Sequence, residues 1–399
     1  MAAPRPSRTL RLGVAGLGRA FTIMLPTLAE DDRIALVAAA DPRAEARARF
    51  AEDFRARTYA TVEELCADPE IDVIYVATPH QLHAQHVRAA TAAKKHVIVE
   101  KPLAVMLADC RAMIDAARKA NVHLIVGHSH SFDAPYRRAR EIIAGGALGK
   151  LGMITAFNFT DFMYRPRRPE ELITEQGGGV IFSQGAHQID IIRLLGGSRL
   201  RSVRAATGTW DPARPAEGAY SALLTFADGA FATAVYSGYG HFDSDEFSGW
   251  IGEMGLPKDR SRYGEARRSL SGVNAEQEAM LKAARNYGGS AYKPPAAAGA
   301  HLHQQFGLLL ASCQHGDLRP TAEGVMIYGD SEQRLEKVAV PSVPRAEVID
   351  ELYDAVVHGR APLHSGEWAM ATLEVCLAIL RSAKEQRDVT LEHQTGLPA

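Results

Sequence analysis

A glutamate and a lysine stand at the end of a short strand-like run in KKHVIVEKPLAV, residues 94–105. The run from His96 to Val99 predicts a buried strand, and Glu100, Lys101 and Pro102 follow it at once. A lysine held beside a low-dielectric cleft has a pKa that falls readily, so it can exchange protons. The ordinary alternative is a solvated helix start, where Glu, Lys and Pro often occur together.

A glycine turn near the N-terminus carries a second chemical signal. In GVAGLGRAF, residues 13–21, the glycines follow a strand-like run and precede a helical pattern, so the backbone can approach a pyrophosphate at the helix N-terminus. Phe21 stands where G-x-G-x-x-G expects a small residue, so the helix must sit differently on its sheet. The residues expected to contact a dinucleotide in this turn are Gly16, Leu17, Gly18, Arg19 and Ala20.

An acid follows the glycine turn at the spacing of a ribose contact. Asp41 closes the second predicted strand, near the position at which a carboxylate reaches the adenosine hydroxyls of NAD. An acid here favours NAD over NADP because it repels a 2′-phosphate, whereas Arg43 could pair with such a phosphate. NAD is therefore the expected cofactor, with NADP possible. The alternative is that Asp41 only begins a turn with Pro42.

Buried runs alternate regularly with helical patterns over the first third of the chain. The runs RLGVA, IALVAAA, DVIYVA, HVIVE and VHLIVG are separated by segments with helical spacing of their apolar residues. Strands that are apolar throughout predict a parallel sheet covered on both faces. The order of elements therefore predicts an α/β fold that begins with a doubly wound, Rossmann-type sheet.

The pattern changes after about residue 130. LGMITAFNF, RSVRAATGTW and AYSALLTFADGAFATAVYSG alternate in hydrophobicity, and Asp228-Gly229 is typical of a hairpin. We predict a Rossmann domain over residues 1–130 and an α+β domain over residues 131–399, with a large, mainly antiparallel open sheet that binds substrate and assembles a homodimer or homotetramer. Residues 241–301 lose strand periodicity and are expected to form an irregular excursion, as a lid or an oligomer contact.

Composition argues against several classes of protein. The formal net charge of -2 and the pI near 6.7 leave no basic excess for a nucleic acid, and no apolar stretch approaches the length of a membrane span. The 4 cysteines lie far apart without a C-x-x-C pair, which suits a reduced cytoplasm and argues against a disulfide framework. The N-terminus reaches a glycine turn before any long apolar stretch, which argues against a secretory signal. We therefore expect a cytoplasmic protein that binds neither nucleic acid nor membrane.

Several motifs taken together resemble one enzyme family. GVAGLG, VATPHQLH (residues 76–83), EKPLA and GGGVIFSQGAHQIDIIRLLGG (residues 177–197) occur in the order and spacing of the glucose-fructose oxidoreductase, inositol dehydrogenase and MocA (Gfo/Idh/MocA) family. The match covers most of the chain, including HSGEWAMATLEVCLAILRSAKE near its end. The resemblance implies an NAD(P)-dependent dehydrogenase that acts on a small molecule.

The resemblance also implies roles for individual residues. In that family the E-K-P lysine is catalytic and lies beside the nicotinamide, and a later D-x-G-x-H-x-x-D motif supplies a histidine. Carried over, Lys101 and His187 become the proton-handling pair, and Asp190 falls on the last acid of the motif. The further cofactor contacts that the motifs imply are Thr78, Pro79, His83 and Glu100, together with Lys101.

One departure from the family pattern bears on the substrate. Ser183 stands where the motif often begins with Asp, so a carboxylate that would position a sugar hydroxyl is absent. The stretch FTDFMYRPRRPEELITEQGGGVIFSQ is similar instead to the phthalate cis-4,5-dihydrodiol dehydrogenases of this family. Its arginines would suit a dianionic substrate, because guanidinium groups bind carboxylates through two parallel hydrogen bonds, and as exposed loop residues they would contribute little to stability. The residues assigned to the substrate are Arg165, Arg167, Arg168, His128 and Ser183.

The reaction that the resemblance implies is oxidation of an anionic cyclic diol. One carbinol carbon gives a hydride to the nicotinamide while Lys101 or His187 accepts the hydroxyl proton. The resulting ketone tautomerises to an aromatic catechol, which makes the step nearly irreversible.

Alternatives stay open for the function and for each residue. A sugar or cyclitol dehydrogenase is the broader reading, and a nucleotide-sensing or scaffold protein without turnover belongs to another class. His187, in an apolar helix, could be a hydrogen-bonded interface residue, and the arginines could form an ordinary solvated loop. No metal is expected, because three-residue spacing spreads ligands too widely around a helix and no acid cluster accompanies the histidines at His80, His83, His86, His128 and His130.

Overall fold

The computed structural model describes residues 8–293 and 302–397 of the chain. These residues form two compact units, each with its own sheet. Of the described residues, unit 1 takes 8–128, 279–293 and 341–370, and unit 2 takes 129–278, 302–340 and 371–397. The first change of unit lies close to the predicted domain boundary. The two later segments of unit 1 were not predicted, because they were assigned to a single domain over residues 131–399.

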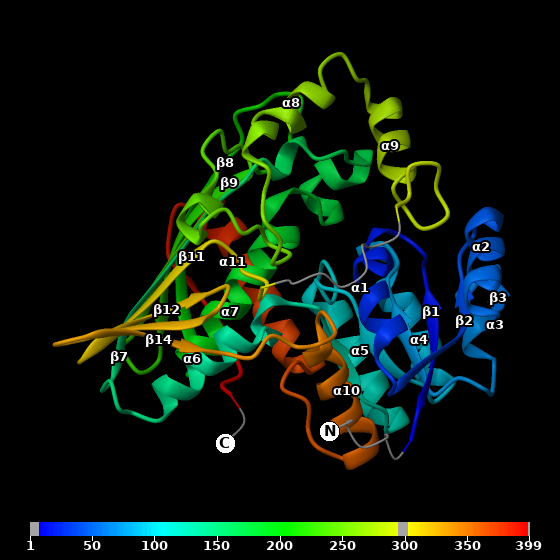
Figure 1. The fold of residues 1–399 in the computed structure, drawn as a ribbon, viewed down its shortest axis with the longest axis horizontal. Helices are drawn as coiled ribbons and strands as arrows, with labels where there is room; N and C mark the ends of the chain where they lie inside the picture. The colour runs from blue at the N-terminus through cyan, green and yellow to red at the C-terminus, as the bar shows by residue number, and fades with distance from the viewer. Residues whose placement is uncertain (1–7, 294–301, 398–399) are drawn as a thin grey trace. The chain divides into compact units, whose positions relative to one another are not determined.

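Unit 1 contains a parallel sheet of six strands in the order β3-β2-β1-β4-β5-β6. Figure 1 shows its strands and the helices α1 to α5 coloured from blue to cyan, and its helix α10 in orange. The strands are β1 (Leu10–Ala15), β2 (Ile34–Ala40), β3 (Arg57–Tyr59), β4 (Val73–Val76), β5 (His96–Val99) and β6 (Leu124–Val126). The helices are α1 (Arg19–Glu30), α2 (Ala44–Phe54), α3 (Val62–Cys66), α4 (His83–Ala92), α5 (Leu107–Ala120) and α10 (Ala346–His358). This strand order is the doubly wound arrangement that the sequence predicts, and β1 and β4 meet where the order reverses.

The sequence explains why these strands lie inside. All residues of β4 are buried, as are most of those of β1 and β5, which is the pattern of a sheet covered on both faces. Local sequence also explains where helix α3 begins. Thr61 caps α3, and Glu64 returns a hydrogen bond to the backbone of Thr61, so both ends of a capping box are present.

Phe21 explains how α1 packs without the third glycine. Its ring is fully buried and lies 5.9 Å from the ring of Phe50 in α2 and 5.3 Å from that of Tyr287. Tyr287 is also fully buried and belongs to unit 1. Part of the predicted irregular excursion therefore packs on the nucleotide-binding unit. Residues 294–301 of that excursion lie outside the described residues.

Unit 2 contains a sheet of nine strands in the order β14-β13-β12-β11-β7-β10-β9-β8-β15. All neighbouring pairs are antiparallel except β7 and β10, so the prediction of a mainly antiparallel sheet is confirmed. The strands are β7 (Leu151–Phe159), β8 (Leu200–Gly208), β9 (Ala219–Phe226), β10 (Phe231–Ser237), β11 (Leu308–Cys313), β12 (Gly316–Thr321), β13 (Gly324–Gly329), β14 (Gln333–Lys337) and β15 (Val389–Thr390). The predicted Asp228-Gly229 turn joins β9 to β10, and Gly229 has a φ of 93°.

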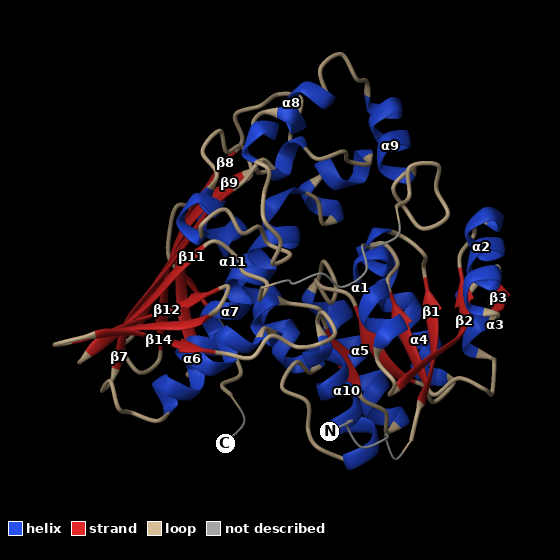
Figure 2. Cartoon of the chain, viewed as in Figure 1, coloured by secondary structure: helices blue, strands red, loops and turns tan. Residues whose placement is uncertain are grey.

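Helices lie against one face of this sheet (Figure 2). They are α6 (Ala134–Ala144), α7 (Ala186–Gly196) and the part of α11 (Gly366–Glu385) that belongs to unit 2. A π-helical turn, Ile181–Gly185, leads into α7. The remaining helices, α8 (Glu265–Ser269) and α9 (Ala275–Ala283), belong to the excursion. Among the described residues, no helix combines the length and the apolar character that crossing a membrane requires.

Candidate active site

The glycine turn of unit 1 has the geometry of a dinucleotide cradle. Gly16 has a φ of 93°, and a Cβ there would lie 3.0 Å from the carbonyl oxygen of Ala77 and 3.0 Å from Cγ2 of Thr78. Gly18 is the N-cap of α1, makes no side-chain cap, and has no atom within 4 Å of where a Cβ would stand. The first amides of α1, including those of Arg19 and Ala20, are thus placed as in helix termini that bind phosphate. These residues fit the pyrophosphate of NAD.

Asp41 braces this turn from the end of β2. Its carboxylate is buried and accepts hydrogen bonds from the backbone N–H of Leu17 at 2.8 Å and of Arg43 at 2.9 Å. The guanidinium of Arg43 donates to Asp41 at 3.0 Å and to the carbonyl of Leu17 at 2.8 Å. Asp41 and Arg43 therefore act together on the conformation of the turn. The ribose contact predicted for Asp41 stays a prediction.

His83 links the two loops that follow β4 and β5. Its ring is fully buried, with Nε2 2.9 Å from the carbonyl oxygen of Thr78 and Nδ1 3.1 Å from that of Pro102. Burial lowers the pKa of His83 to about 4, although these carbonyls oppose the shift. Thr78 also contacts Nδ1 of His86 through its hydroxyl at 2.9 Å. His83 therefore positions Thr78 and the loop after Lys101, and its predicted contact with the cofactor stays a prediction.

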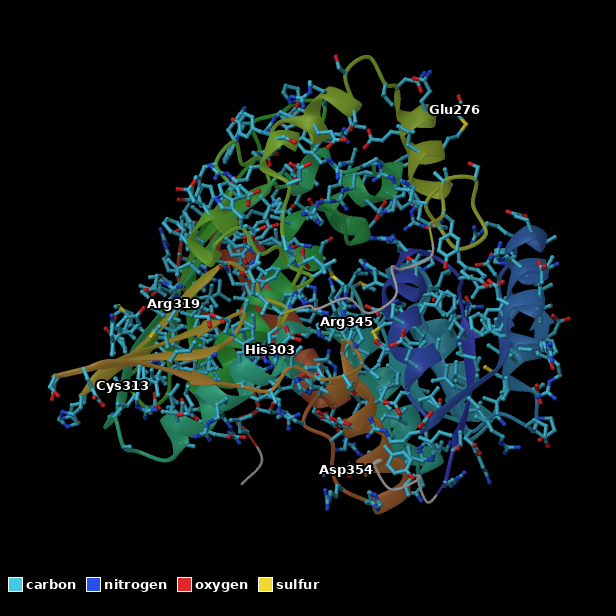
Figure 3. All side chains as sticks on the ribbon, viewed as in Figure 1. Glu276, His303, Cys313, Arg319, Arg345 and Asp354 are labelled. Atoms are coloured by element: carbon cyan, nitrogen blue, oxygen red, sulfur yellow. The ribbon has the colours of Figure 1, made fainter. Side chains whose placement is uncertain are left out.

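Glu100 and Lys101 leave β5 at the carboxyl edge of the sheet, as predicted. The backbone N–H of Glu100 still donates to Val76 at 3.0 Å, and the Lys101–Pro102 peptide bond is cis. The buried Tyr75 donates its hydroxyl to Glu100 at 2.6 Å. Burial raises the pKa of Glu100, while the hydrogen bond from Tyr75 and the positive charges of Lys101 and Arg345 oppose the rise. Arg345, which precedes α10, is labelled in Figure 3.

His187 and Asp190 both lie on α7 in unit 2, and both are buried. Asp190 accepts hydrogen bonds from the hydroxyl of Ser131 and, at 2.8 Å, from that of Thr372. Arg193 donates to Thr372 at 2.7 Å and lies 3.9 Å from Asp190. Asp190 therefore ties α7 to the loop after β6 and to α11. These contacts hold α7, the helix that carries His187, and the catalytic role predicted for Asp190 stays a prediction.

Three residues that motif reasoning did not assign join His187. The ring of His130 lies 4.9 Å from that of His187, centroid to centroid. Nδ1 of His130 is 2.7 Å from the carboxylate of Asp133, and Nε2 is 3.5 Å from Oε1 of Glu253. Burial alone would lower the pKa of His130, but the charges and hydrogen bonds of Asp133 and Glu253 raise it. Their chain positions explain why these residues were missed, because Glu253 lies far from the histidines in sequence and within the irregular excursion.

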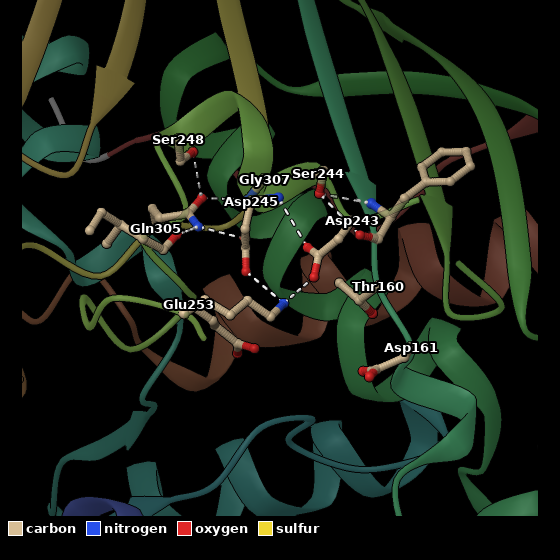
Figure 4. Close-up of polar contacts among 12 residues, drawn as sticks. Thr160, Asp161, Asp243, Ser244, Asp245, Ser248, Glu253, Gln305 and Gly307 are labelled. Carbon is tan, nitrogen blue, oxygen red and sulfur yellow. Dashed lines mark hydrogen bonds and ion pairs between the residues drawn. The ribbon is translucent and has the colours of Figure 1, made fainter. Parts of the chain in front are cut away.

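A polar network holds the segment that carries Glu253 (Figure 4). Gln305 donates its backbone N–H to the carbonyl of Glu253 at 3.3 Å and its side chain to the carbonyl of Ile251 at 2.7 Å. The same side chain donates to Asp245 at 2.9 Å. Lys258 pairs with Asp245 at 3.0 Å, and it pairs with Asp243 as well. Glu253 therefore projects from a fixed turn, although the sequence there lacks regular periodicity.

The three arginines expected to clamp a dicarboxylate have different surroundings. Arg167 is 9% exposed, stacks over the ring of Phe162 with 3.7 Å between Cζ and the ring centroid, and donates to the carbonyl of that residue at 2.6 Å. Burial lowers its pKa to about 10. Arg168 pairs with Glu170 at 3.1 Å, within its own turn. The expectation that these arginines are exposed loop residues of little structural weight is therefore wrong for Arg167, because it packs into the unit.

Arg165 is the member of this group with an ion pair to Glu253. Its guanidinium lies 3.6 Å from Asp161 and 3.9 Å from Glu253, and its side chain is 44% exposed. Ser183 is half-buried in the turn before α7, and His128 is buried at the end of unit 1. The substrate roles of these residues stay predictions.

Each unit, taken by itself, carries groups of the kind that hydride-transfer enzymes use. Unit 1 offers a cradle for a dinucleotide and a lysine at the carboxyl edge of its sheet, where ligands of doubly wound folds bind. Unit 2 offers a buried histidine pair with carboxylates and one accessible arginine. A lysine and a histidine of this kind can accept the proton of a hydroxyl group that is being oxidised.

Comparisons with known proteins cover segments of both units. A family model described as an oxidoreductase family with an NAD-binding Rossmann fold matches residues 10–128, and a GFO/IDH/MocA C-terminal domain model matches residues 136–249. The 1-carboxy-3-chloro-3,4-dihydroxycyclohexa-1,5-diene dehydrogenase of Comamonas testosteroni is 46% identical over 381 residues, which are 94% of this chain and 96% of that protein.

Two further comparisons show how far the similarity extends. The crystal structure of a protein from Bordetella bronchiseptica RB50 is 41% identical and superposes with a TM-score of 0.90, covering 96% of this chain and 100% of that one. A myo-inositol 2-dehydrogenase of Thermotoga maritima is 31% identical over 197 residues, which are 49% of this chain and 58% of that protein. The first of these similarities runs through nearly the whole chain, and the second through about half of it.

Proposed function

Since this chain belongs to the Gfo/Idh/MocA family of NAD-binding oxidoreductases, we propose that it oxidises a carboxylated cis-dihydrodiol of a cyclohexadiene ring, with a phthalate dihydrodiol as the sharper candidate. The observation that carries the proposal is the similarity to the Comamonas dehydrogenase, which is named for a carboxylated cyclohexadiene diol and matches 94% of this chain. The inositol dehydrogenase matches only 49% of it, which gives a cyclitol substrate less support.

NAD supplies the hydride acceptor for this reaction. Gly16, Leu17 and Gly18 with the first residues of α1 would hold its pyrophosphate, and Asp41 would face the adenosine ribose. The pairing of Arg43 with Asp41 at 3.0 Å favours NAD over NADP, because it engages the guanidinium that a 2′-phosphate would need.

The chain's own groups handle the proton. As the carbinol C–H bond breaks and its electron pair leaves with the hydride, the O–H proton passes to Lys101 or His187, and a ketone forms. The remaining carbinol carbon then loses its proton, and the ketone oxygen gains one, which leaves a catechol. Aromatisation favours this direction. Arg165, with one guanidinium nitrogen 3.9 Å from Glu253 and 44% of its side chain exposed, is the arginine best placed to bind a substrate carboxylate.

The role of Lys101 is tested with Lys101→Met. We expect turnover to fall by about two to four decades, because a positioned general acid or base contributes that much. The affinity for NAD should change little, since the glycine turn and Asp41 hold the nucleotide. The measurement is steady-state NADH formation on a carboxylated dihydrodiol, with NAD binding followed by nucleotide fluorescence. Unchanged turnover would remove Lys101 from the chemistry.

A further inference from the structure

We propose that His130, His187 and Glu253 form a binding site for a divalent transition-metal ion of the zinc type. The three side chains come from separate parts of unit 2: a turn before α6, the helix α7 and the turn held by Gln305. One potential ligand atom from each lies within 4.8 Å of the others. The histidines are buried, and the side chain of Glu253 is 33% exposed. This proposal goes beyond the proposed oxidation and does not rest on it.

The distance between His130 and Glu253 suits two ligands of one ion. Nε2 of His130 lies 3.5 Å from Oε1 of Glu253. Charge-assisted hydrogen bonds of this type are shorter, about 2.7–2.9 Å. Two ligands at about 2.0–2.2 Å from a tetrahedral zinc ion are separated by roughly 3.4 Å, the edge of the tetrahedron. The ligand atoms of the whole set lie within 4.8 Å of one another, so a rotation of the side chain of His187 would complete the set.

Asp133 prepares His130 for such a role. Its carboxylate lies 2.7 Å from Nδ1 of His130, so Nδ1 carries a proton. The other ring nitrogen, Nε2, faces Glu253. In the metal-bound form Nε2 would give up any proton it shares with Glu253 and direct its lone pair at the ion, which Glu253 would bind as well. Metal-binding histidines typically have a carboxylate on the second ring nitrogen, as Asp133 is here.

The donor set selects among metals. Two imidazoles and one carboxylate suit zinc and neighbouring transition metals, while magnesium prefers oxygen ligands alone. A set of three protein ligands leaves a coordination position for an oxygen of a bound small molecule or for water. If zinc occupies the ring nitrogen of His187, that nitrogen cannot also accept a proton, so Lys101 would be the base in the metal-bound form. From the sequence no metal was expected, because of the spacing of the histidines and the lack of an acid cluster beside them. Glu253 was not considered, because it lies far from these histidines along the chain.

The test is direct metal binding to the full chain without an affinity tag. After dialysis against a chelator, the protein is titrated with Zn²⁺ by calorimetry, and Co²⁺ is added to a second sample to record the absorption of a tetrahedral site. We expect one ion per chain. Glu253→Gln should weaken binding about tenfold or more, and Asp133→Asn about ten- to a hundredfold, as for other carboxylates that hydrogen-bond to a metal-bound histidine. Mg²⁺ should not compete.

Glu246→Gln is the matched control, since Glu246 is an exposed acid of the neighbouring turn and should leave the affinity unchanged. Glu253 is partly exposed, so its amide variant should fold, which circular dichroism checks. Absence of bound zinc, with a proton alone between His130 and Glu253, would overturn the proposal. Zinc binding that survives both Glu253→Gln and Asp133→Asn would place the ion on other histidines and overturn it equally.

Discussion

At the scale of single residues, the neighbouring arginines Arg167 and Arg168 differ in burial, so they should differ in their contribution to stability. Arg167 stacks on Phe162 and donates to its carbonyl, whereas Arg168 pairs with an acid of its own turn at the surface. We expect Arg167→Ala to lower the free energy of unfolding by about 2–3 kcal/mol, because it removes a cation–π contact and a charge-assisted hydrogen bond. Arg168→Ala should change it by less than about 0.5 kcal/mol. Urea unfolding of both variants measures the difference.

Equal unfolding free energies for the two arginine variants would contradict the buried role of Arg167. A rise in the Michaelis constant of Arg167→Ala is therefore not evidence of substrate binding unless its stability is measured beside it. Arg165→Ala is the cleaner probe of carboxylate binding, because the side chain of Arg165 is partly exposed and its loss should disturb packing less.

His96 makes the stability of unit 1 depend on pH. Burial, followed by the neighbouring charges of His123 and Arg8, lowers the pKa of His96 to about 4, and its Nδ1 accepts the backbone N–H of His123 at 3.1 Å. Between pH 6.5 and about 4 the unfolded chain binds a proton at His96 that the folded chain does not, so stability falls as the pH falls. From pH 7 to pH 5 we expect a loss of about 1–2 kcal/mol from this half-buried group.

His96→Asn separates this effect from other titrations. Asparagine retains an acceptor for the N–H of His123 but does not titrate, so its unfolding free energy should fall less between pH 7 and pH 5 than that of the wild type. Guanidinium unfolding at the two pH values gives the comparison. Identical losses in both proteins would assign the pH dependence to other groups.

The family resemblance singled out Lys101 and His187, whose catalytic roles stay predictions. Lys101 and His187 belong to motifs whose order along the chain is itself informative, so both were identified before any fold was known. His130, Asp133 and Glu253 could not be found in this way. These residues come together only because the loop after β6, helix α7 and the turn held by Gln305 lie side by side in unit 2. No local sequence pattern encodes this packing.

At the scale of elements, the excursion contributes an aromatic anchor to the nucleotide-binding unit. Tyr287 contacts Phe21 and Phe50, and its hydroxyl donates to Asp53 at 2.6 Å. Its backbone carbonyl lies 3.3 Å from the guanidinium of Arg43, which braces the glycine turn. This segment therefore supports α1, α2 and the turn between β1 and α1.

Truncation of Tyr287 tests that support. We expect Tyr287→Ala to lower the unfolding free energy by about 3–5 kcal/mol, the usual cost of removing a fully buried aromatic side chain. Tyr287→Phe loses only the hydrogen bond to Asp53 and should cost about 1 kcal/mol. Thermal and chemical unfolding of both variants give the values. A cost near zero for Tyr287→Ala would mean that the segment does not pack on unit 1 in solution.

The elements themselves were largely predictable, and the exceptions have a common cause. The strands of unit 1 are apolar throughout, and the β9–β10 hairpin has an Asp-Gly turn, so local sequence identifies them. The excursion has no periodic pattern, and its structure comes from distant partners. Tyr287 packs on Phe21, and Gln305 holds the turn of Glu253.

At the scale of the whole molecule, local patterns predicted the fold class but not the complete order of strands. Alternating hydrophobicity predicts an antiparallel sheet, but it does not show that β7 lies between β10 and β11 and pairs with β10 in parallel. The assignment of Pro341–Met370 to unit 1 likewise depends on long-range pairing, such as the bridge between Ile125 and Ser365. The oligomeric state predicted from the second sheet stays a prediction.

The central claim is that this NAD-dependent oxidoreductase acts on a carboxylated cyclic diol. It is tested most directly by measuring NADH formation with a phthalate cis-dihydrodiol and with the uncharged cis-dihydrodiol of benzene, and comparing kcat/KM. A charge-assisted contact to a carboxylate contributes about 1.5–3 kcal/mol, so we predict a preference of roughly ten- to a hundredfold for the carboxylated diol. Equal values, or rapid oxidation of myo-inositol without any activity on carboxylated diols, would contradict the claim and leave a sugar or cyclitol dehydrogenase in its place.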